Sequence, residues 1–273
     1  MSREEIEQQI RDWEKEQKNV QTNERIRLFE KWTEDLFHLI PIKDQETFFQ
    51  HIDQWLFHTH ALLQNVPLGK HAVENVLQTG KIFNTDIRSV EDMKQLSIDQ
   101  LTYIAKDQIS SNRWISIIQG GLTGTGRISF VGLDLPLAIL INLRLVYVIG
   151  STFGYEMRKP YEMMIALKVF HAASLPKRLQ SEAWASLQDE LTLNHHGYMY
   201  EGDEHTTNVR SMHQPLRQIV KNLFLIRLRN KKTSRFPFIR VGVSAYLNDQ
   251  LTYQVGEFTL RFYQKRFLTE ERR

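Results

Sequence analysis

Apolar residues recur every three or four positions along most of this chain, which is the spacing of one face of an α-helix. No stretch alternates apolar and polar residues at every second position, so we expect little or no sheet. The pattern therefore predicts an all-α protein, a multi-helix bundle. The predicted helices cover these segments: 48–64, 71–83, 98–109, 161–173, 180–193, 216–229 and 239–267.

The N-terminal 40 residues are more polar than the rest of the chain. Ile6, Ile10 and Trp13 form a narrow apolar stripe at helical spacing, and Ser2 with Glu5 has the spacing of a capping box. We expect a polar helical arm over residues 1–40 that packs on the body through this stripe, followed by one helical domain over residues 41–273. A helix that binds a partner is the alternative for the arm.

A glycine-rich block precedes the most apolar stretch of the chain. Four glycines within residues 120–126 are typical of a sharp turn or a close backbone approach. Asp134 is suited to cap a helix, and Pro136 fits a first helical turn. Residues 135–149 are almost entirely apolar, as in a buried helix. We therefore predict a glycine-rich loop leading into a buried central helix, with these structural residues: Gly120, Gly121, Gly124, Gly126, Gly132, Asp134 and Pro136.

The composition restricts the cellular compartment that we expect for the protein and the kinds of chemical site that it can form. The chain has no cysteine, which excludes disulfides, thiolate metal ligands and cysteine nucleophiles and fits a reducing cytosol. The first residues are charged rather than apolar, so we expect no secretory signal. The best candidate for a spanning helix, residues 130–149, contains Asp134, Asn142 and Arg144, and central charges are costly in a bilayer. We expect no conventional transmembrane helix, while surface attachment or partial insertion stays open.

The motifs of common enzymes are incomplete. Gly121 and Gly126 have the spacing of a phosphate-binding loop, but Arg127 and Ile128 stand where lysine and a hydroxyl residue are needed. No nucleophile elbow is present, and we predict no catalytic residue and no cofactor. The region 195–213 is rich in histidine and acidic residues and could fold around zinc, although it matches no fixed ligand spacing. A metal-dependent hydrolase using this region is therefore an alternative function, and solvated histidines are the simpler interpretation.

Charge is distributed unevenly. Residues 214–273 hold 13 basic and 4 acidic residues, a net charge of +9, whereas residues 1–213 hold 22 basic and 28 acidic residues, a net charge of −6. Basic residues that alternate with apolar ones suit an anionic lipid surface, and no nucleic-acid motif accompanies them. Attraction between the two halves of the chain is the alternative. The candidate membrane- or anion-binding residues are Lys221, Arg227, Arg229, Lys231, Lys232, Arg235 and Arg240.

Several blocks of the sequence resemble the EcsC family of bacterial proteins. They are residues 96–101, the glycine-rich block with Gly132 to Pro136, the stretch from Leu143-Arg144 through Gly154-Tyr155, and two C-terminal stretches, 236–248 and 255–263. The resemblance implies a mostly helical protein of undefined activity, associated with an ABC transport system. It implies no established catalytic residues. Arg240 and Tyr246 stand where such proteins have more small residues, which argues against deep membrane packing there.

Together these observations predict a non-enzymatic accessory protein of EcsC type, cytoplasmic and peripheral on the inner face of the cell membrane. It would serve an ABC transport or envelope process. The expected partners are an anionic membrane surface and ABC transporter subunits, with no nucleic acid. A soluble adaptor that binds only proteins is a further alternative.

Overall fold

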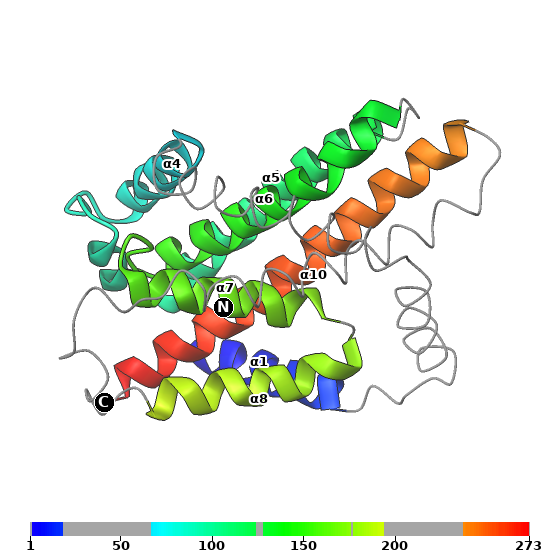
Figure 1. Ribbon diagram of the computed structural model, residues 1–273. Helices are drawn as coiled ribbons and strands as arrows, with labels where there is room; N and C mark the ends of the chain where they lie inside the picture. Colours follow the sequence, from blue (N-terminus) through cyan, green and yellow to red (C-terminus); the bar gives the residue numbers. More distant parts are fainter. Residues whose placement is uncertain (1, 19–66, 124–127, 176, 194–236, 273) are drawn as a thin grey trace.

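The computed structural model describes residues 2–18, 67–123, 128–175, 177–193 and 237–272. Within these ranges the chain forms α-helices, one short 3-10 helix and no strand, so the all-α prediction is confirmed for the described residues. The elements, drawn in Figure 1, are α1 (Arg3–Lys18), α4 (Pro67–Phe83), η1 (Glu91–Gln95), α5 (Ile98–Thr123), α6 (Ile128–Thr152), α7 (Pro160–Ser174), α8 (Lys177–Leu193) and α10 (Pro237–Glu271).

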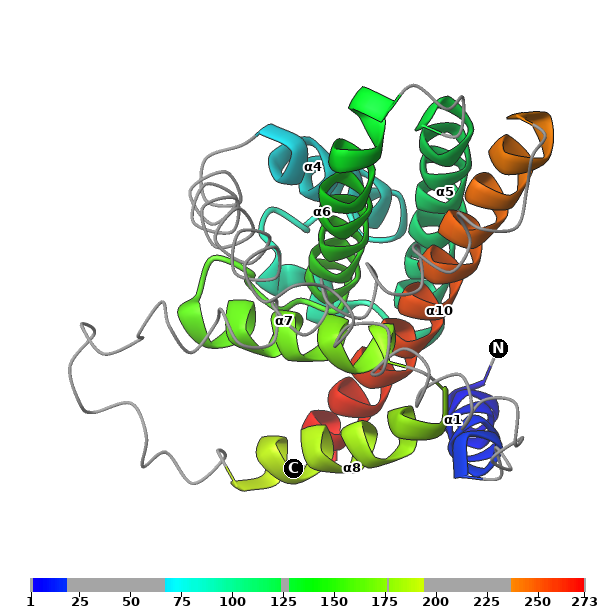
Figure 2. The same ribbon diagram turned by 45° about the vertical axis from the view of Figure 1, so that its right-hand side comes forward.

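Three long helices, α5, α6 and α10, form the frame of the fold. Figures 1 and 2 both show that the hairpin end of α5 and α6 lies at the same end of the molecule as the start of α10. α10 packs along α5 and also contacts α6 and α7, while α4 lies on α6. α1 and α8 pack together beside the C-terminal part of α10. We call the end formed by residues 114–123, 128–137 and 237–253 the helix tip, and the opposite end the body.

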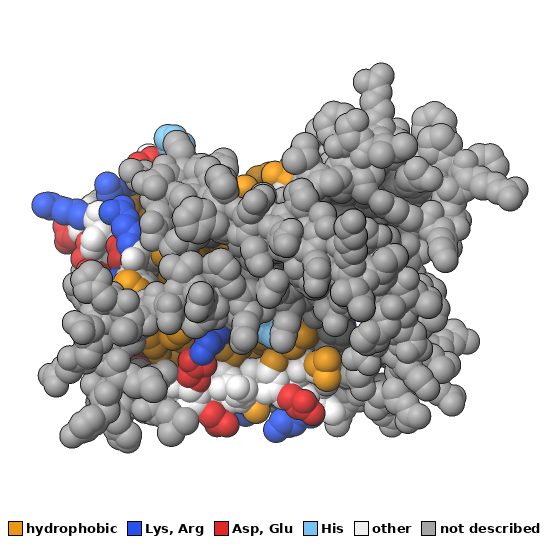
Figure 3. Space-filling view, in the orientation of Figure 1, with side chains coloured by type: hydrophobic (Ala, Val, Ile, Leu, Met, Phe, Trp, Pro, Cys, Tyr) orange, Lys and Arg blue, Asp and Glu red, His pale blue; other side chains and the backbone are white. Residues whose placement is uncertain are grey.

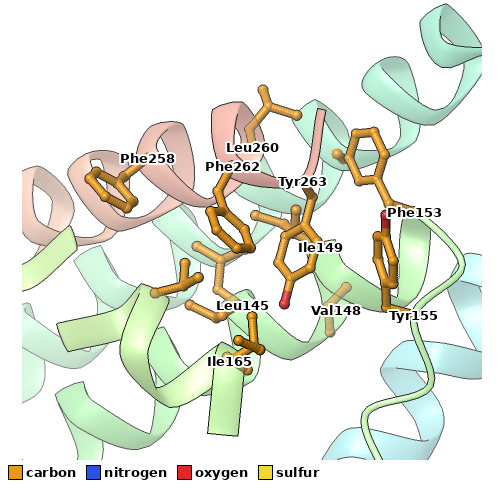
Figure 4. Packing of buried hydrophobic residues seen from close by; sticks show 14 of the residues in the cluster. Leu145, Val148, Ile149, Phe153, Tyr155, Ile165, Phe258, Leu260, Phe262 and Tyr263 are labelled. Atoms are coloured by element: carbon orange, nitrogen blue, oxygen red, sulfur yellow. The ribbon is translucent and has the colours of Figure 1, made fainter. Parts of the chain in front are cut away.

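The core lies in the body, where α5, α6, α7, α8 and α10 meet. Figure 4 shows apolar side chains of α6, such as Leu145 and Ile149, directed toward Phe262 and Tyr263 of α10. Both partners are fully buried, so these contacts remove large apolar surfaces from water. Burial on this scale explains why these helices are stable although few of them are strongly amphipathic.

Two glycines allow α10 to approach its neighbours closely. A Cβ atom at Gly150 would lie 2.8 Å from Cζ of Tyr263, and a Cβ atom at Gly256 would lie 2.9 Å from two side-chain carbons of Ile109. Both distances are shorter than van der Waals contact. The glycines therefore mark the crossings of α10 with α6 and with α5.

The first helix is integrated into the body by its apolar stripe. Ser2 and Glu5 form the predicted capping box, with Ser2 N–H donating to Glu5 Oε2 at 2.8 Å and Glu5 N–H donating to Ser2 Oγ at 3.2 Å. The ring of Trp13 lies 4.8 Å from that of Trp184 and 5.6 Å from that of Phe258, measured between centroids. The stripe thus packs on the body, and the proposed domain boundary near residue 40 lies outside the described residues.

The glycine-rich loop is shorter than the sequence suggested, and the predicted cap is wrong. α5 continues through Gly120 and Gly121 to Thr123, while Gly124 and Gly126 lie outside the described residues. α6 begins at Ile128, so Asp134 is inside the helix instead of at its start. Gly132 and Pro136 are also helical. An interior proline removes only one helix hydrogen bond and can bend a helix without ending it, which is why this local signal misled.

Candidate functional site

The predicted basic surface cannot be placed as a whole. Its residues before position 236 lie outside the described residues, and Arg240 lies in α10 with its side chain likewise outside the description. The histidine-rich region 195–213 is outside as well. In the part of the chain that the structure describes, no three histidine or acidic residues cluster as metal ligands. The anion-binding and metal hypotheses therefore stay predictions.

A group of polar residues joins α5, α6 and α10 where the helix tip meets the body, and we call it the polar clasp. Arg113 of α5 donates two hydrogen bonds to Asp249 of α10, at 2.7 and 2.9 Å, and its guanidinium lies 4.8 Å from the ring centroid of Tyr253. One turn away, the hydroxyls of Ser116 and Thr252 are 2.6 Å apart and buried. The clasp fixes the register of α10 against α5.

The third helix joins the clasp through Arg144, whose Nη1 donates to Asn112 Oδ1 at 2.8 Å. Asn112 itself is buried and donates to the carbonyl of Gln108. Burial lowers the pKa of Arg144, which still leaves an arginine charged at neutral pH. Arg144, one of the polar residues that interrupt the apolar pattern of α6, is thus explained by a hydrogen bond between helices.

The ion pair in the clasp predicts a pH effect on stability. The hydrogen bonds from Arg113 hold the pKa of Asp249 below its usual value. The resulting stabilisation is complete above the unfolded pKa of about 3.9 and is lost as the pH falls through the lower folded pKa. We expect Asp249→Asn to lower the thermal midpoint at pH 7 and this difference to shrink between about pH 5 and pH 2. Circular dichroism melts would measure it, with the exposed Asp107→Asn variant as control; parallel curves for Asp249→Asn and wild type would contradict the assignment.

Beyond the clasp, the outer face of α5 exposes several large apolar residues. Nearer the body this face exposes polar residues, among them Lys106, Asp107 and Ser110, together with Tyr103, which is 64% exposed. At the helix tip it exposes Trp114 (68%) and Ile118 (59%), with Ile115 beside them. We call Trp114, Ile115 and Ile118 the apolar tip face. Exposed large apolar residues that lie together on one face mark interaction surfaces more often than scattered ones.

Large apolar residues are also exposed on the two neighbouring helices. Leu137 of α6 is exposed to 41%, and Tyr253 of α10 to 42%. Tyr253 lies at the level of Trp114 along α5, because Arg113 contacts its ring. Charged side chains of both signs lie side by side over α8 on the face seen in Figure 3. The helix tip thus exposes several large apolar residues, whereas the face over α8 exposes charged ones.

The opposite end of the molecule holds a partly buried ion network around Arg266 of α10, in which Arg266 and Glu162 are buried. Arg266 donates from both terminal nitrogens to the carboxylate of Glu162 on α7, at 2.6 Å each, and stacks 3.8 Å from the ring centroid of Tyr155. Its Nε donates to Glu270 at 3.1 Å, and Lys94 donates to the same carboxylate at 2.9 Å. Two cations and two anions thus neutralise one another.

The electrostatics of this network point to a structural role. Burial opposes ionisation of Glu270, but the hydrogen bonds from Lys94 and Arg266 hold its pKa below the usual value. Burial raises the pKa of Tyr155 strongly, so its hydroxyl stays protonated. The network links η1, α7 and α10, and its charges are already satisfied by one another. It offers no poised acid, base or nucleophile.

Sequence reasoning did not find this network, although a signal was present. Glu162 is the single acidic residue of α7, and a carboxylate near the start of an otherwise apolar helix predicts a buried partner. Gly154, which directly precedes Tyr155, has a φ of +84°, a conformation that favours glycine. The Gly154-Tyr155 block is thereby assigned a role in placing the aromatic ring against Arg266.

The described residues define an all-helical protein with an apolar tip, a polar clasp and a neutral buried ion network, and with no catalytic set among them. A family model described as EcsC protein family matches residues 4–268, so the chain belongs to the EcsC family. It is similar to Protein EcsC of Bacillus subtilis (strain 168), with 22% identity over 180 residues that make up 66% of this chain and 69% of that protein. No solved structure matches. None of the described helices is long and apolar enough to cross a bilayer.

Proposed function

We propose that this protein is a non-enzymatic accessory protein that attaches peripherally to an anionic membrane surface, on the cytoplasmic side. The observation that carries the proposal is the apolar tip face, formed by exposed Trp114, Ile115 and Ile118. α10 begins at Pro237 at the same end of the molecule, directly after the basic stretch that contains Lys231, Lys232 and Arg235. An apolar surface combined with basic residues matches the chemistry of a membrane of anionic lipids.

The EcsC resemblance implies no established catalytic residues, and this supports the non-enzymatic part of the proposal. Among the described residues, the buried charges of Glu162 and Arg266 pair with each other, and Arg113 pairs with Asp249 in the clasp. We propose further that the protein serves an ABC transport or envelope process, as the EcsC resemblance implies. Co-purification of an ATPase and a permease subunit with the protein from detergent-solubilised membranes would support that part.

Flotation with lipid vesicles tests the membrane attachment. We expect the purified protein to float with anionic vesicles and not with zwitterionic vesicles at low salt, because each basic residue near an anionic surface adds about 1 kcal/mol of attraction. The quadruple variant Arg229→Gln, Lys231→Gln, Lys232→Gln, Arg235→Gln should bind several times more weakly. Salt should weaken the wild-type binding without abolishing it, because exposed charges are screened whereas apolar contacts are not.

A matched variant controls for general loss of charge. Lys15→Gln, Lys18→Gln, Lys81→Gln, Lys106→Gln removes four basic residues elsewhere on the chain and should bind like wild type. If wild type stays in the soluble fractions under all these conditions, the basic stretch faces protein and the soluble adaptor becomes the better description.

A further inference from the structure

One side of α5 carries a row of exposed side chains whose spacing is the same in both directions. Its members are Tyr103, Asp107, Ser110 and Trp114, separated by four, three and four residues. Residues three and four apart share one face of a helix, so this row extends over about 17 Å. Tyr103 is 64% exposed and Trp114 is 68% exposed, which places an aromatic ring at each end and polar residues in the middle. We call these four residues the α5 stripe.

Further apolar side chains adjoin both ends of the α5 stripe. The ring of Phe83 on α4 lies 6.2 Å from the ring of Tyr103, measured between centroids, and Ile82 beside it is 80% exposed. At the other end, Ile118 lies one helical turn beyond Trp114 and is 59% exposed. Exposed aromatic residues at both ends are typical of protein interfaces, in which tyrosine, tryptophan and phenylalanine are enriched.

A second copy of the same face matches the α5 stripe when the two α5 helices lie antiparallel. A two-fold axis then passes the midpoint of the stripe, so Tyr103 of each copy lies opposite Trp114 of the other. By the same symmetry, Asp107 of each copy lies opposite Ser110 of the other. Rings thus meet rings at both ends of the contact, and a carboxylate meets a hydroxyl in the middle.

The polar middle of the α5 stripe favours a second copy over lipid as the occupant of the whole face. Asp107 and the neighbouring Lys106 are both exposed, and burying charges in hydrocarbon without partners is costly. Across a helix pair, the Asp107 carboxylate can accept a hydrogen bond from the Ser110 hydroxyl. That hydroxyl donates to the carbonyl of Lys106 within one copy, at 3.1 Å, and is free to rotate toward a new acceptor. The adjacent charges of Lys106 and Asp107 also cancel, so the two copies do not repel each other there.

The exposed surface has the size that a dimer contact requires. Aromatic side chains bury about 150–250 Å² each, so the exposed fractions of Phe83, Tyr103 and Trp114 amount to roughly 350 Å² per copy. The exposed isoleucines at both ends bring this area closer to the roughly 800 Å² per partner that standard interfaces bury.

We infer that two copies of this protein pair in solution through the α5 stripe, as an antiparallel two-fold dimer with Tyr103 against Trp114. The inference goes beyond the proposed function, because it names a second copy of the chain as a partner. The apolar tip face shares Trp114 with the α5 stripe. Pairing therefore shields that part of the tip face from water in solution, and a membrane would compete with the second copy for it.

Opposite charges introduced at the two ends of the stripe test the pairing by sedimentation velocity. Wild type should sediment with twice the mass of one chain. Trp114→Lys and Tyr103→Glu should each weaken self-association more than tenfold, because a charge without a counter-charge is then buried in both halves of the contact. Mixed in equal amounts, the two variants should associate again. Their introduced charges, which have opposite signs, face each other at one end, and the native rings meet at the other.

Leu137→Lys is the matched control for these variants. Leu137 is an apolar residue of α6 with 41% exposure, and it lies outside the α5 stripe. Its replacement should leave the dimer as in wild type. All three substituted positions are exposed, so each variant is expected to keep its fold, and circular dichroism would verify this.

Cross-linking provides a second measurement that leaves both rings in place. The chain has no cysteine, so an introduced one reacts alone. Ser110→Cys lies next to the two-fold axis of the inferred dimer and should give a covalent dimer with a short bis-maleimide. Ala185→Cys, at an exposed position of α8, should give none.

The outcomes separate this inference from the proposed function. If wild type sediments as a single chain at all concentrations, the inference is overturned, and flotation still decides on membrane attachment. If a dimer persists in Trp114→Lys, if the mixed variants stay apart, or if Ser110→Cys does not cross-link, pairing through the α5 stripe is overturned. A dimer that fails to float with vesicles would support the inference while contradicting the proposed membrane attachment.

Discussion

Replacing Glu162 with glutamine is expected to lower the free energy of unfolding by about 3 kcal/mol, which would be measured by urea denaturation. The variant keeps the size of the side chain but leaves the buried guanidinium of Arg266 without its bidentate partner. Breaking a buried pair costs about 3–5 kcal/mol because an uncompensated charge remains in a medium of low polarity. We expect the lower end of this range, since Glu270 still accepts a hydrogen bond from Arg266.

The matched control is Glu91→Gln, which removes a carboxylate from an exposed pair with Lys159. Water already solvates both of these groups, so the unfolding midpoint should stay at that of wild type. A double variant, Glu162→Leu with Arg266→Met, should recover much of the lost stability because it removes both charges together. A Glu162→Gln variant as stable as wild type would show that the network contributes nothing net to folding.

Replacing Gly150 with alanine is expected to destabilise the protein by about 2 kcal/mol, as measured by the same denaturation. The added Cβ atom would lie 2.1 Å from Cε of Met157 and 2.8 Å from Cζ of Tyr263. The methionine end can rotate away. The tyrosine ring cannot, since it is fully buried and lies 5.4 Å from the ring of Tyr155 and 5.1 Å from that of Phe262, measured between centroids. α10 would therefore have to move away from α6.

Gly80→Ala is the matched control, because its added Cβ atom would meet only the ends of side chains. It would lie 2.6 Å from Sδ of Met93 and 3.3 Å from Cδ1 of Ile87. A flexible thioether can shift, and alanine in a helix is favoured over glycine by about 1 kcal/mol, so stability should stay near that of wild type. Equal effects of the two substitutions would argue that the α6–α10 crossing does not depend on Gly150.

The contacts that stabilise the protein and its exposed apolar residues lie in different parts of the molecule. The ion network and the glycine crossing stabilise the body, whereas the clasp of Arg113, Asp249 and their neighbours lies between the body and the helix tip. Because Arg113 and Asp249 pair with each other in the clasp, no unpaired charge of this pair lies next to the apolar tip face. Stability and surface chemistry are thus located in different parts of the same long helices.

The positions of most described helices could be read from the sequence alone. The segments 71–83, 161–173, 180–193 and 239–267 correspond to α4, α7, α8 and α10, with ends that differ by a few residues. The helical period is a local property, because each turn of a helix places residues three and four apart on the same face. The capping box of Ser2 and Glu5 was predictable for the same reason.

The candidate sites depended on contacts between distant parts of the chain. An apolar run such as residues 114–118 reads the same whether it is buried or exposed, and only the position of α10 beside the opposite face of α5 left Trp114 and Ile118 facing outward. Glu162 and Arg266 are 104 residues apart, so no local pattern could pair them. Local periodicity determined the helices of this protein, and the tertiary structure decided which of their faces became core, ion network or exposed tip, since burial depends on neighbours that sequence proximity does not supply.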